Sequence, residues 1–435
     1  MPERTSSPEP QASHADASGE RRDPFLASAS LKELMTRGMI EEVFVEAEFL
    51  KLVEGARPLT IYFGLDPTSP NLHLGHLVSL RILRWFQLHG HRVIFLIGDF
   101  TGRIGDPTDK SATRKTLSHD EVLNNARTYE EQAGMILDFG GDNPVEIKFN
   151  SEWLDQLTFR DIIELASKVT VQQMLERDMF RERMRQNKPV SLHEFLYPLM
   201  QGYDSVEMSV DVELGGRDQL FNMMVGRDLV RALQERSKHV ITTPLLPGLD
   251  GRKMGKTEGN TVDLTAKPAA MYQKLTQIKD GLLPEFLAIL SDAPDSEINE
   301  VKERLDRGET NLMDAREKFA FHVVERLHGE RSAEEARAEF RRVVVQQELP
   351  SEIEVAELAV PAEGLDLVAI LIEAGRADSR SQARRLVKQN AVRLNDERKT
   401  DSEEVFTLEQ LTETLLRVGK QPILRLNPLT RQAES

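Results

Sequence analysis

Short apolar segments that alternate with longer helix-like ones restrict the fold of this 435-residue chain more than any other feature. The run "LTIYFG" (59–64) is short, apolar and aromatic, as a buried strand is, and "RVIFLIGD" (92–99) has the same character. Between them, "LGHLVSLRILRWFQLHG" (74–90) carries apolar residues largely at helical spacing. Two strands joined by a helix through short connections predict a βαβ unit, and therefore a parallel sheet.

Later segments extend the pattern, so that we expect an α/β fold for residues 26–265. The further strand candidates are "VEIKFN" (145–150), "SVDVELGG" (209–216) and "HVITTPLL" (239–246). The stretch at about 151–208 is mostly helical and predicts an insertion within this Rossmann-like parallel sheet domain.

The remaining segments predict additional domains. Residues 266–347 are charged and strand-poor, which predicts an α-helical domain, and 348–364 have the prolines and acidic residues of a linker. Residues 365–435 combine a helical stretch with two short strand-like runs around an Asn395-Asp396 turn and predict a small α+β domain. The first 25 residues are rich in Ser, Pro, Ala and charge, which is typical of a disordered tail.

Composition narrows the classes of function. The chain has no cysteine, so disulfides and thiolate metal sites are excluded and we expect a reducing, cytoplasmic location. No apolar run approaches the 18 or so residues of a membrane span, so we expect no membrane partner. The net charge of −16 disfavours a uniform nucleic-acid binder, but residues 376–399 hold eight basic and three acidic side chains. The sequence therefore predicts a small basic region within an otherwise acidic protein.

The segment "GLDPTSPNLHLGH" (64–76) follows the first strand and places two histidines at a helix start. We expect Asn71 as the N-cap, with His73 and His76 in the first helical turn. Unpaired N–H groups and the helix dipole favour an anion there, so the imidazoles are placed to donate to phosphate oxygens. A zinc pair that needs a third ligand and a simple capping role remain the alternatives.

A second polar pattern lies in "SLHEFLYPLMQGYDSVEM" (191–208), where Tyr197, Gln201 and Asp204 share one helical face. Apolar neighbours predict that this stripe is partly buried, and buried polar groups need partners. Either a polar ligand or a neighbouring loop would meet that need. Pro198 is expected to kink the helix.

These motifs resemble known signatures. "DPTSPNLHLGH" is similar to the HIGH motif of class I aminoacyl-tRNA synthetases, and "GRKMGKTEGN" (251–260) resembles their KMSKS loop. The second motif keeps both lysines, while Gly255 and Thr257 replace its serines. The helical stripe resembles that of the tyrosyl branch, and the C-terminal part resembles an S-four-like RNA-binding fold. The chain is thus identified as a member of the bacterial-type tyrosyl-tRNA synthetase family.

The resemblance implies a role for each matching residue. Those expected to act in catalysis are Thr68, His73, His76, Lys253 and Lys256. Those expected to bind tyrosine are Tyr62, Asp106, Tyr197, Gln201, Asp204 and Gln219. ATP would be bound by Gly64, Asp66, Asp218 and the two loop lysines. Contacts to tRNA are expected from Lys110, Arg114, Arg380, Arg384, Arg385 and Lys388.

The implied reaction converts L-tyrosine and ATP to tyrosyl-AMP and pyrophosphate, then transfers tyrosine to the terminal adenosine of tRNA(Tyr). The resemblance also implies Mg²⁺ with the ATP but no protein-bound metal, anticodon recognition by residues 266–347, and a homodimer. Three alternatives stay open: a tryptophan enzyme, which Tyr62 with Asp204 disfavours, a non-catalytic RNA-binding relative, and a metal-dependent hydrolase that uses the two histidines.

Overall fold

The computed structural model describes residues 23–106, 118–255, 258–351, 353–419, 421 and 423–430. The chain divides near residue 337 into two compact units. Lys110, Arg114 and Lys256, as well as most of the expected N-terminal tail, lie outside the described residues.

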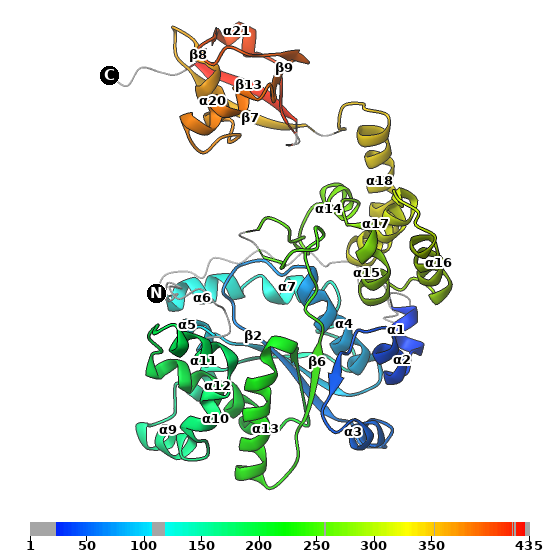
Figure 1. The fold of residues 1–435 in the computed structure, drawn as a ribbon, viewed down its shortest axis with the longest axis vertical. Coiled ribbons are helices and arrows are strands. Elements are labelled where there is room, and N and C mark those ends of the chain that lie inside the picture. The colour runs from blue at the N-terminus through cyan, green and yellow to red at the C-terminus, as the bar shows by residue number, and fades with distance from the viewer. Residues whose placement is uncertain are drawn as a thin grey trace, which may run out of the picture. The chain divides into compact units, whose positions relative to one another are not determined.

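The first unit is built on the predicted parallel sheet (Figure 1). Its strands are β1 (Glu42–Val43), β2 (Thr60–Leu65), β3 (Arg92–Ile97), β4 (Glu146–Phe149), β5 (Val212–Gly216) and β6 (His239–Thr243). They lie in the order β1-β6-β5-β2-β3-β4, and every pair is parallel except β1 with β6. The predicted α/β class is confirmed, while the short edge strand β1 was not foreseen.

The strand order reverses beside β2, which lies between β5 and β3. The chain runs from β2 to β3 and β4 in one direction and from β5 to β6 in the other. Helix α4 (Leu74–Leu88) packs on β2 and β3, and α13 (Leu220–Gln234) packs on β5 and β6. In open parallel sheets, ligands bind outside the carboxyl ends of the strands at such a reversal.

The other helices fall into three groups along the chain. Before β4 lie α1 (Pro24–Ser28), α2 (Leu31–Thr36), α3 (Glu46–Val53), α5 (Thr101–Ile104), α6 (His119–Ala126) and α7 (Tyr129–Ala133). The helical insertion comprises α8 (Ser151–Leu154), α9 (Phe159–Ala166), α10 (Val171–Leu175), α11 (Asp178–Arg185) and α12 (Leu192–Glu207). After β6 come α14 (Pro268–Leu275), α15 (Leu283–Leu290), α16 (Asp295–Asp306), α17 (Met313–His328) and α18 (Glu330–Phe340). Short turns η2 (Arg217–Gln219), η3 (Asp280–Leu282) and η4 (Arg341–Val345) complete the helical elements.

The second unit is a small α+β body. Its strands are β7 (Glu354–Val360), β8 (Leu365–Asp366), β9 (Val392–Leu394), β10 (Glu397–Arg398), β11 (Val405–Phe406), β12 (Leu415–Val418) and β13 (Leu424–Thr430). Its helices are α19 (Leu367–Glu373), α20 (Arg380–Lys388) and α21 (Leu408–Leu411). Five strands form a sheet in the order β10-β9-β12-β13-β7, with β7 parallel to β13.

The expected linker at 348–364 is wrong for residues 354–360, because they form β7 and pair with β13 along its whole length. Leu358 and Val360 alternate into the core of this unit, which holds the strand in place despite its two exposed acidic residues, Glu354 and Glu357. The hairpin between β9 and β10 turns at Asn395 and Asp396, both with positive φ, as such residues tolerate.

Among the helices that the structure describes, none is long and apolar enough to cross a membrane.

Candidate functional site

The two histidines of the first motif cap α4. His73 itself is the N-cap: its Nδ1 accepts the Gly75 N–H at 3.1 Å, while the His73 N–H donates to Nδ1 of His76 at 3.0 Å. The prediction of Asn71 as the cap is therefore wrong, because its side chain donates to Asp263 at 3.0 Å instead. Since each Nδ1 accepts a hydrogen bond, the imidazole proton sits on Nε2 in both rings. This tautomer suits donation to phosphate and disfavours zinc binding through Nε2.

The second motif and the residues that follow it lie against the first motif. The Leu74 N–H donates to the Val262 carbonyl at 3.0 Å, and the Leu264 N–H donates to the Leu72 carbonyl at 2.9 Å. A Cβ added to Gly75 would lie 3.4 Å from the sulfur of Met254. Two segments almost 180 residues apart in sequence are thus joined at the N-terminus of α4, as the resemblance implies.

Asn260 organises the loop that carries Lys253. Its Oδ1 accepts the Gly255 N–H, and its Nδ2 donates to the Lys253 carbonyl and to Asp250, each at 3.0 Å. The hydrogen bond from Asn260, followed by the backbone N–H of Arg252, lowers the pKa of Asp250 to about 2. Asn260 and Asp250 had not been singled out in the sequence, where an Asn and an Asp in a loop give no specific signal.

Asp66 joins the end of β2 to the helical stripe. Its carboxylate accepts the Tyr197 hydroxyl at 2.7 Å and the Thr101 hydroxyl at 2.6 Å. A Cβ at Gly98 would lie 2.1 Å from this carboxylate, so only glycine leaves room for it. The neighbouring Thr68 donates its N–H to the Asp66 carbonyl at 2.7 Å, which makes a tight turn.

Asp204 is buried and already holds two donors. Trp153 Nε1 donates to it at 2.8 Å and Asn150 Nδ2 at 3.3 Å, and Asn150 also donates to Thr101 at 2.9 Å. Burial raises the pKa of Asp204 well above its usual value, and these two hydrogen bonds oppose the shift. A hydrogen-bonded chain therefore connects Asp204 with Asp66.

A second chain of hydrogen bonds starts from the stripe at Gln201. Asn222 Nδ2 donates to Gln201 Oε1 at 2.9 Å and to Gln219 Oε1 at 3.1 Å. Gln219 Nε2 donates in turn to Asp106 at 2.7 Å, and Arg177 pairs with the same carboxylate at 3.2 Å. Gln219 Nε2 also lies 3.4 Å from the carboxylate of the preceding residue, Asp218.

Tyr62 reaches the same stripe from β2. Its hydroxyl lies 3.0 Å from the hydroxyl of Ser205, the residue after Asp204. Burial, then the charges of Glu213 and Asp204, raise the pKa of Tyr62 well above its usual value. Gly64 lies near the end of the same strand, where a Cβ would be 3.8 Å from the Tyr62 ring.

The structure thus brings most of the expected tyrosine and ATP residues to one region, at the carboxyl ends of β2 and β5. Carboxylates dominate it, which suits an ammonium group, and the two motif segments add imidazole and ammonium donors for an anion. Sequence reasoning did not single out several polar residues of this region: Thr101, Asn150, Trp153, Arg177, Ser205, Glu213, Asn222 and Lys238. Among the described residues, no three His, Asp or Glu side chains are grouped to hold a metal ion.

The expected tRNA-binding residues of the second unit lie on α20. Ala383 and Val387 are buried, whereas the basic side chains of this helix are exposed. Arg380 pairs with Asp366 at 3.1 Å and Arg384 with Glu403 at 3.0 Å. The helix therefore presents a basic surface that is partly balanced by acidic neighbours.

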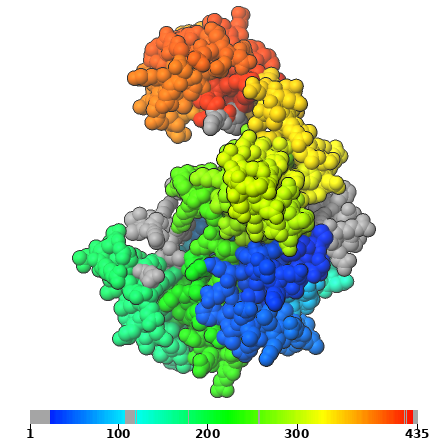
Figure 2. Space-filling model, turned by 45° about the vertical axis from the view of Figure 1, so that its right-hand side comes forward, coloured from blue at the N-terminus to red at the C-terminus, as the bar shows by residue number. Residues whose placement is uncertain are grey.

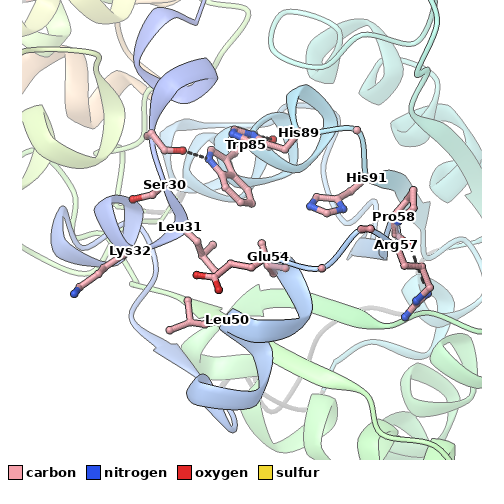
Figure 3. A pocket seen from close by; sticks show the side chains of 15 residues that line it. Ser30, Leu31, Lys32, Leu50, Glu54, Arg57, Pro58, Trp85, His89 and His91 are labelled. Carbon is pink, nitrogen blue, oxygen red and sulfur yellow. Dashed lines mark hydrogen bonds between the residues drawn. The ribbon is translucent and has the colours of Figure 1, made fainter.

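A cavity of about 400 Å³ lies elsewhere, at the amino-terminal side of β2 and β3 (Figure 3). Trp85 Nε1 donates there to the Ala29 carbonyl at 2.7 Å, and His91 accepts the Leu59 N–H at 3.2 Å. None of the expected site residues lines this cavity.

Comparisons with protein families agree with this geometry. The profile described as tRNA synthetases class I (W and Y) matches residues 54–345. The profile of the tyrosine-tRNA ligase SYY-like C-terminal domain matches residues 347–422.

Two relatives show the same similarity over most of the chain. The tyrosine-tRNA ligase of Moorella thermoacetica is 42% identical over 398 residues, which cover 91% of this chain and 95% of the relative. That of Carboxydothermus hydrogenoformans is 44% identical over 407 residues, covering 91% and 97%.

Solved structures also resemble the fold. A C-terminally truncated mitochondrial tyrosyl-tRNA synthetase from Coccidioides posadasii has a TM-score of 0.59 at 25% identity, covering 73% of this chain and 94% of that one. A tryptophanyl-tRNA synthetase from Encephalitozoon cuniculi has a TM-score of 0.55 at 17% identity, covering 73% and 90%. The likeness to the tryptophan enzyme extends to the fold alone.

Proposed function

Because this chain belongs to the tyrosine-tRNA ligase family of class I synthetases, we propose that it activates L-tyrosine with ATP and charges tRNA(Tyr) at the region described above. The observation that carries this proposal is the junction of the two motif segments beside α4. The same region gathers Tyr62, Asp204 and Gln201 from two different elements.

In the first step, an oxygen of the tyrosine carboxylate bonds to the α-phosphorus of ATP while the bond to the pyrophosphate oxygen breaks. The carboxylate is ionised at neutral pH, so the step needs no general base. It needs alignment and stabilisation of negative charge. We assign that stabilisation to the Nε2–H groups of His73 and His76, and to Thr68, Lys253 and Lys256.

In the second step, a hydroxyl of the terminal adenosine of tRNA attacks the tyrosyl carbonyl, and AMP leaves. We assign Asp106, Tyr197, Gln201 and Gln219 to the substrate ammonium side, because Asp106 and the two glutamines form linked carboxylate and amide acceptors. The phenol end is assigned to Tyr62 and Asp204. Gly64, Asp66 and Asp218 are assigned to the nucleotide.

Mg²⁺ would arrive with ATP, because this ion is usually bound through substrate phosphates rather than by an all-protein site. No step of the mechanism here depends on it. A cytoplasmic location is proposed from the substrates, ATP and tRNA.

ATP–pyrophosphate exchange tests the first step directly. We expect exchange that depends on tyrosine and is supported by neither tryptophan nor phenylalanine at equal concentration. Exchange with tryptophan would assign the chain to the other amino acid of the family, and no exchange with any amino acid would favour the non-catalytic RNA-binding alternative.

We propose that α20 contacts tRNA. The support is its exposed basic surface, and phosphate contacts make binding sensitive to salt. Arg385→Glu should raise KM for tRNA several-fold and leave pyrophosphate exchange unchanged. Lys51→Glu, at an exposed lysine in the last turn of α3, is the matched control. Equal effects of both substitutions would remove α20 from the interface.

We also propose a homodimer formed through the helical insertion. Large apolar side chains are exposed on it, namely Phe159, Ile163, Val171, Met184 and Leu192, and Phe159 is 81% exposed. Figure 2 shows part of this insertion at the surface of the first unit. Phe159→Glu with Leu192→Glu should shift the sedimentation coefficient to that of a monomer, whereas Val405→Glu in the second unit should not. A parent chain that sediments as a monomer at micromolar concentration would contradict the dimer.

A further inference from the structure

A buried ion pair lies directly behind the expected tyrosine residues. Glu213 is in β5, in register with Tyr62 of β2, and Lys238 immediately precedes β6. Their exposed fractions are 2% and 0%, and Lys238 Nζ contacts the Glu213 carboxylate. Neither residue belongs to the motifs that the sequence showed.

Stability alone gives a poor account of this pair. Removing two charges from water costs several kcal/mol for each ion, and the attraction between them often only balances that cost. Apolar side chains of similar size would fill the same space with equal or greater stability. The role of the pair is therefore to be found in the groups that it holds.

The first of these groups is Ser205. Lys238 Nζ donates to the Ser205 hydroxyl at 2.9 Å, and that hydroxyl donates to Glu213 Oε2 at 3.3 Å. A serine hydroxyl has one hydrogen, so while Ser205 donates to Glu213 the 3.0 Å contact between Tyr62 and Ser205 uses the Tyr62 hydrogen. The ion pair thus fixes the direction of the Tyr62 hydroxyl.

The second group is Gln201. Its Nε2 donates to Glu213 Oε1 at 3.1 Å, while its Oε1 accepts from Asn222. The two bonds set which end of the amide is nitrogen and which is oxygen. One carboxylate, Glu213, therefore contacts both the amide of Gln201 and the hydroxyl behind Tyr62.

The surrounding helices leave a space that matches the lysine. At Gly226 of α13, a Cβ would lie 2.6 Å from Lys238 Nζ and 3.1 Å from the Cα of Gly202 in α12. The two glycines let α12 and α13 approach closely, and the lysine passes beside them. In Figure 1 these helices lie side by side.

We propose that Glu213 and Lys238 are positioning residues for tyrosine recognition, which hold the phenol-side Tyr62 and the ammonium-side Gln201 in one fixed arrangement. This inference rests on the proposed function. The pair acts on the specificity of tyrosine binding, through Ser205 and Gln201. It does not contact the reacting atoms.

The decisive variant is the double substitution Glu213→Met with Lys238→Met, which removes both charges together and keeps the volume filled. We expect thermal stability near that of the parent, since no unpaired charge remains. KM for tyrosine should rise, and the preference for tyrosine over phenylalanine should fall, each by about 10- to 100-fold, which corresponds to one lost hydrogen bond with a charged partner. KM for ATP should stay unchanged.

Ser205→Ala is the second variant, and it removes one hydroxyl with little risk to folding. It should lower the tyrosine preference by about tenfold. Arg92→Met is the control, because Arg92 pairs with Glu146 between β3 and β4, away from β5, and its loss should leave both quantities unchanged.

The measurements are tyrosine-dependent and phenylalanine-dependent ATP–pyrophosphate exchange, together with thermal unfolding. The inference alone would be overturned if the parent is active and both variants, folded, keep the parental KM for tyrosine and the parental preference for tyrosine over phenylalanine. If the double variant does not fold, the Ser205→Ala variant tests the inference by itself: an unchanged KM for tyrosine and an unchanged tyrosine preference would overturn it. A parent without tyrosine-dependent exchange would instead refute the proposed function.

Discussion

The backbone N–H of His73 donates to Nδ1 of His76 across 3.0 Å. His73 is the N-cap of α4, and His76 lies in the first turn of that helix. His73 combines two roles that a substitution can separate. Its Nδ1 caps α4, and its Nε2–H is the proposed phosphate donor.

His73→Asn should retain the cap, because asparagine is a preferred N-cap residue, but its shorter amide donor does not reach the position of the Nε2–H. We expect adenylate formation to slow by about 10²- to 10³-fold with little change in tyrosine KM, as loss of one preorganised donor does. His73→Ala should lose about 1 kcal/mol of stability in addition. Rapid-quench measurement of adenylate and urea unfolding check the two effects, and an unaltered rate in His73→Asn removes the residue from the mechanism.

Asp204→Asn should weaken selection of the phenol hydroxyl. The new amide can donate as well as accept, and it faces Trp153 and Asn150, which are themselves donors. We expect the tyrosine preference over phenylalanine to drop by about 10- to 100-fold. Competition kinetics with both amino acids measure the ratio. A ratio equal to the parent's would show that selection depends on other groups.

Asn260→Ala should disorder the loop that carries Lys253, because it removes three hydrogen bonds at once. We expect kcat for exchange to fall at least tenfold with tyrosine KM unchanged. Asn143→Ala, which removes a loop amide that bonds to the Gln87 and His91 carbonyls away from the site, is the control. Parental kcat in the Asn260 variant would mean that the loop keeps its arrangement by other contacts.

Folding stability should decrease on acidification below about pH 6.5. Burial lowers the folded-state pKa of His91, His239 and His328, and in His91 the neighbouring His89 adds to the effect. The unfolded chain then binds more protons as the pH falls through the ordinary histidine pKa, so the stability present above about pH 6.5 is lost progressively below it. Each histidine contributes a slope of at most about 1.4 kcal/mol per pH unit.

Urea unfolding at pH 8, 7, 6 and 5.5 checks this prediction. In the His91→Gln variant the slope should be smaller, because one titrating group is gone. Stability that is flat or rises between pH 7 and 5.5 would contradict the assignment of these buried, neutral rings.

The local pattern of the sequence was sufficient for β2, α4 and β3, because apolar periodicity reports directly which faces are buried. It was also sufficient for the hairpin at Asn395, where turn chemistry is local. It failed for β7, since a short strand with exposed acidic residues looks like a linker until its partner β13 is known.

The sequence by itself determined the fold class and the two motifs, because periodicity and motif spacing are properties of neighbouring residues. Only the tertiary structure decided that Tyr62 bonds to Ser205. It also revealed that Lys238 and Glu213 are buried behind the stripe. These contacts join residues from separate strands and helices, and a lysine or glutamate in a sequence carries no sign of burial until the chain has packed around it.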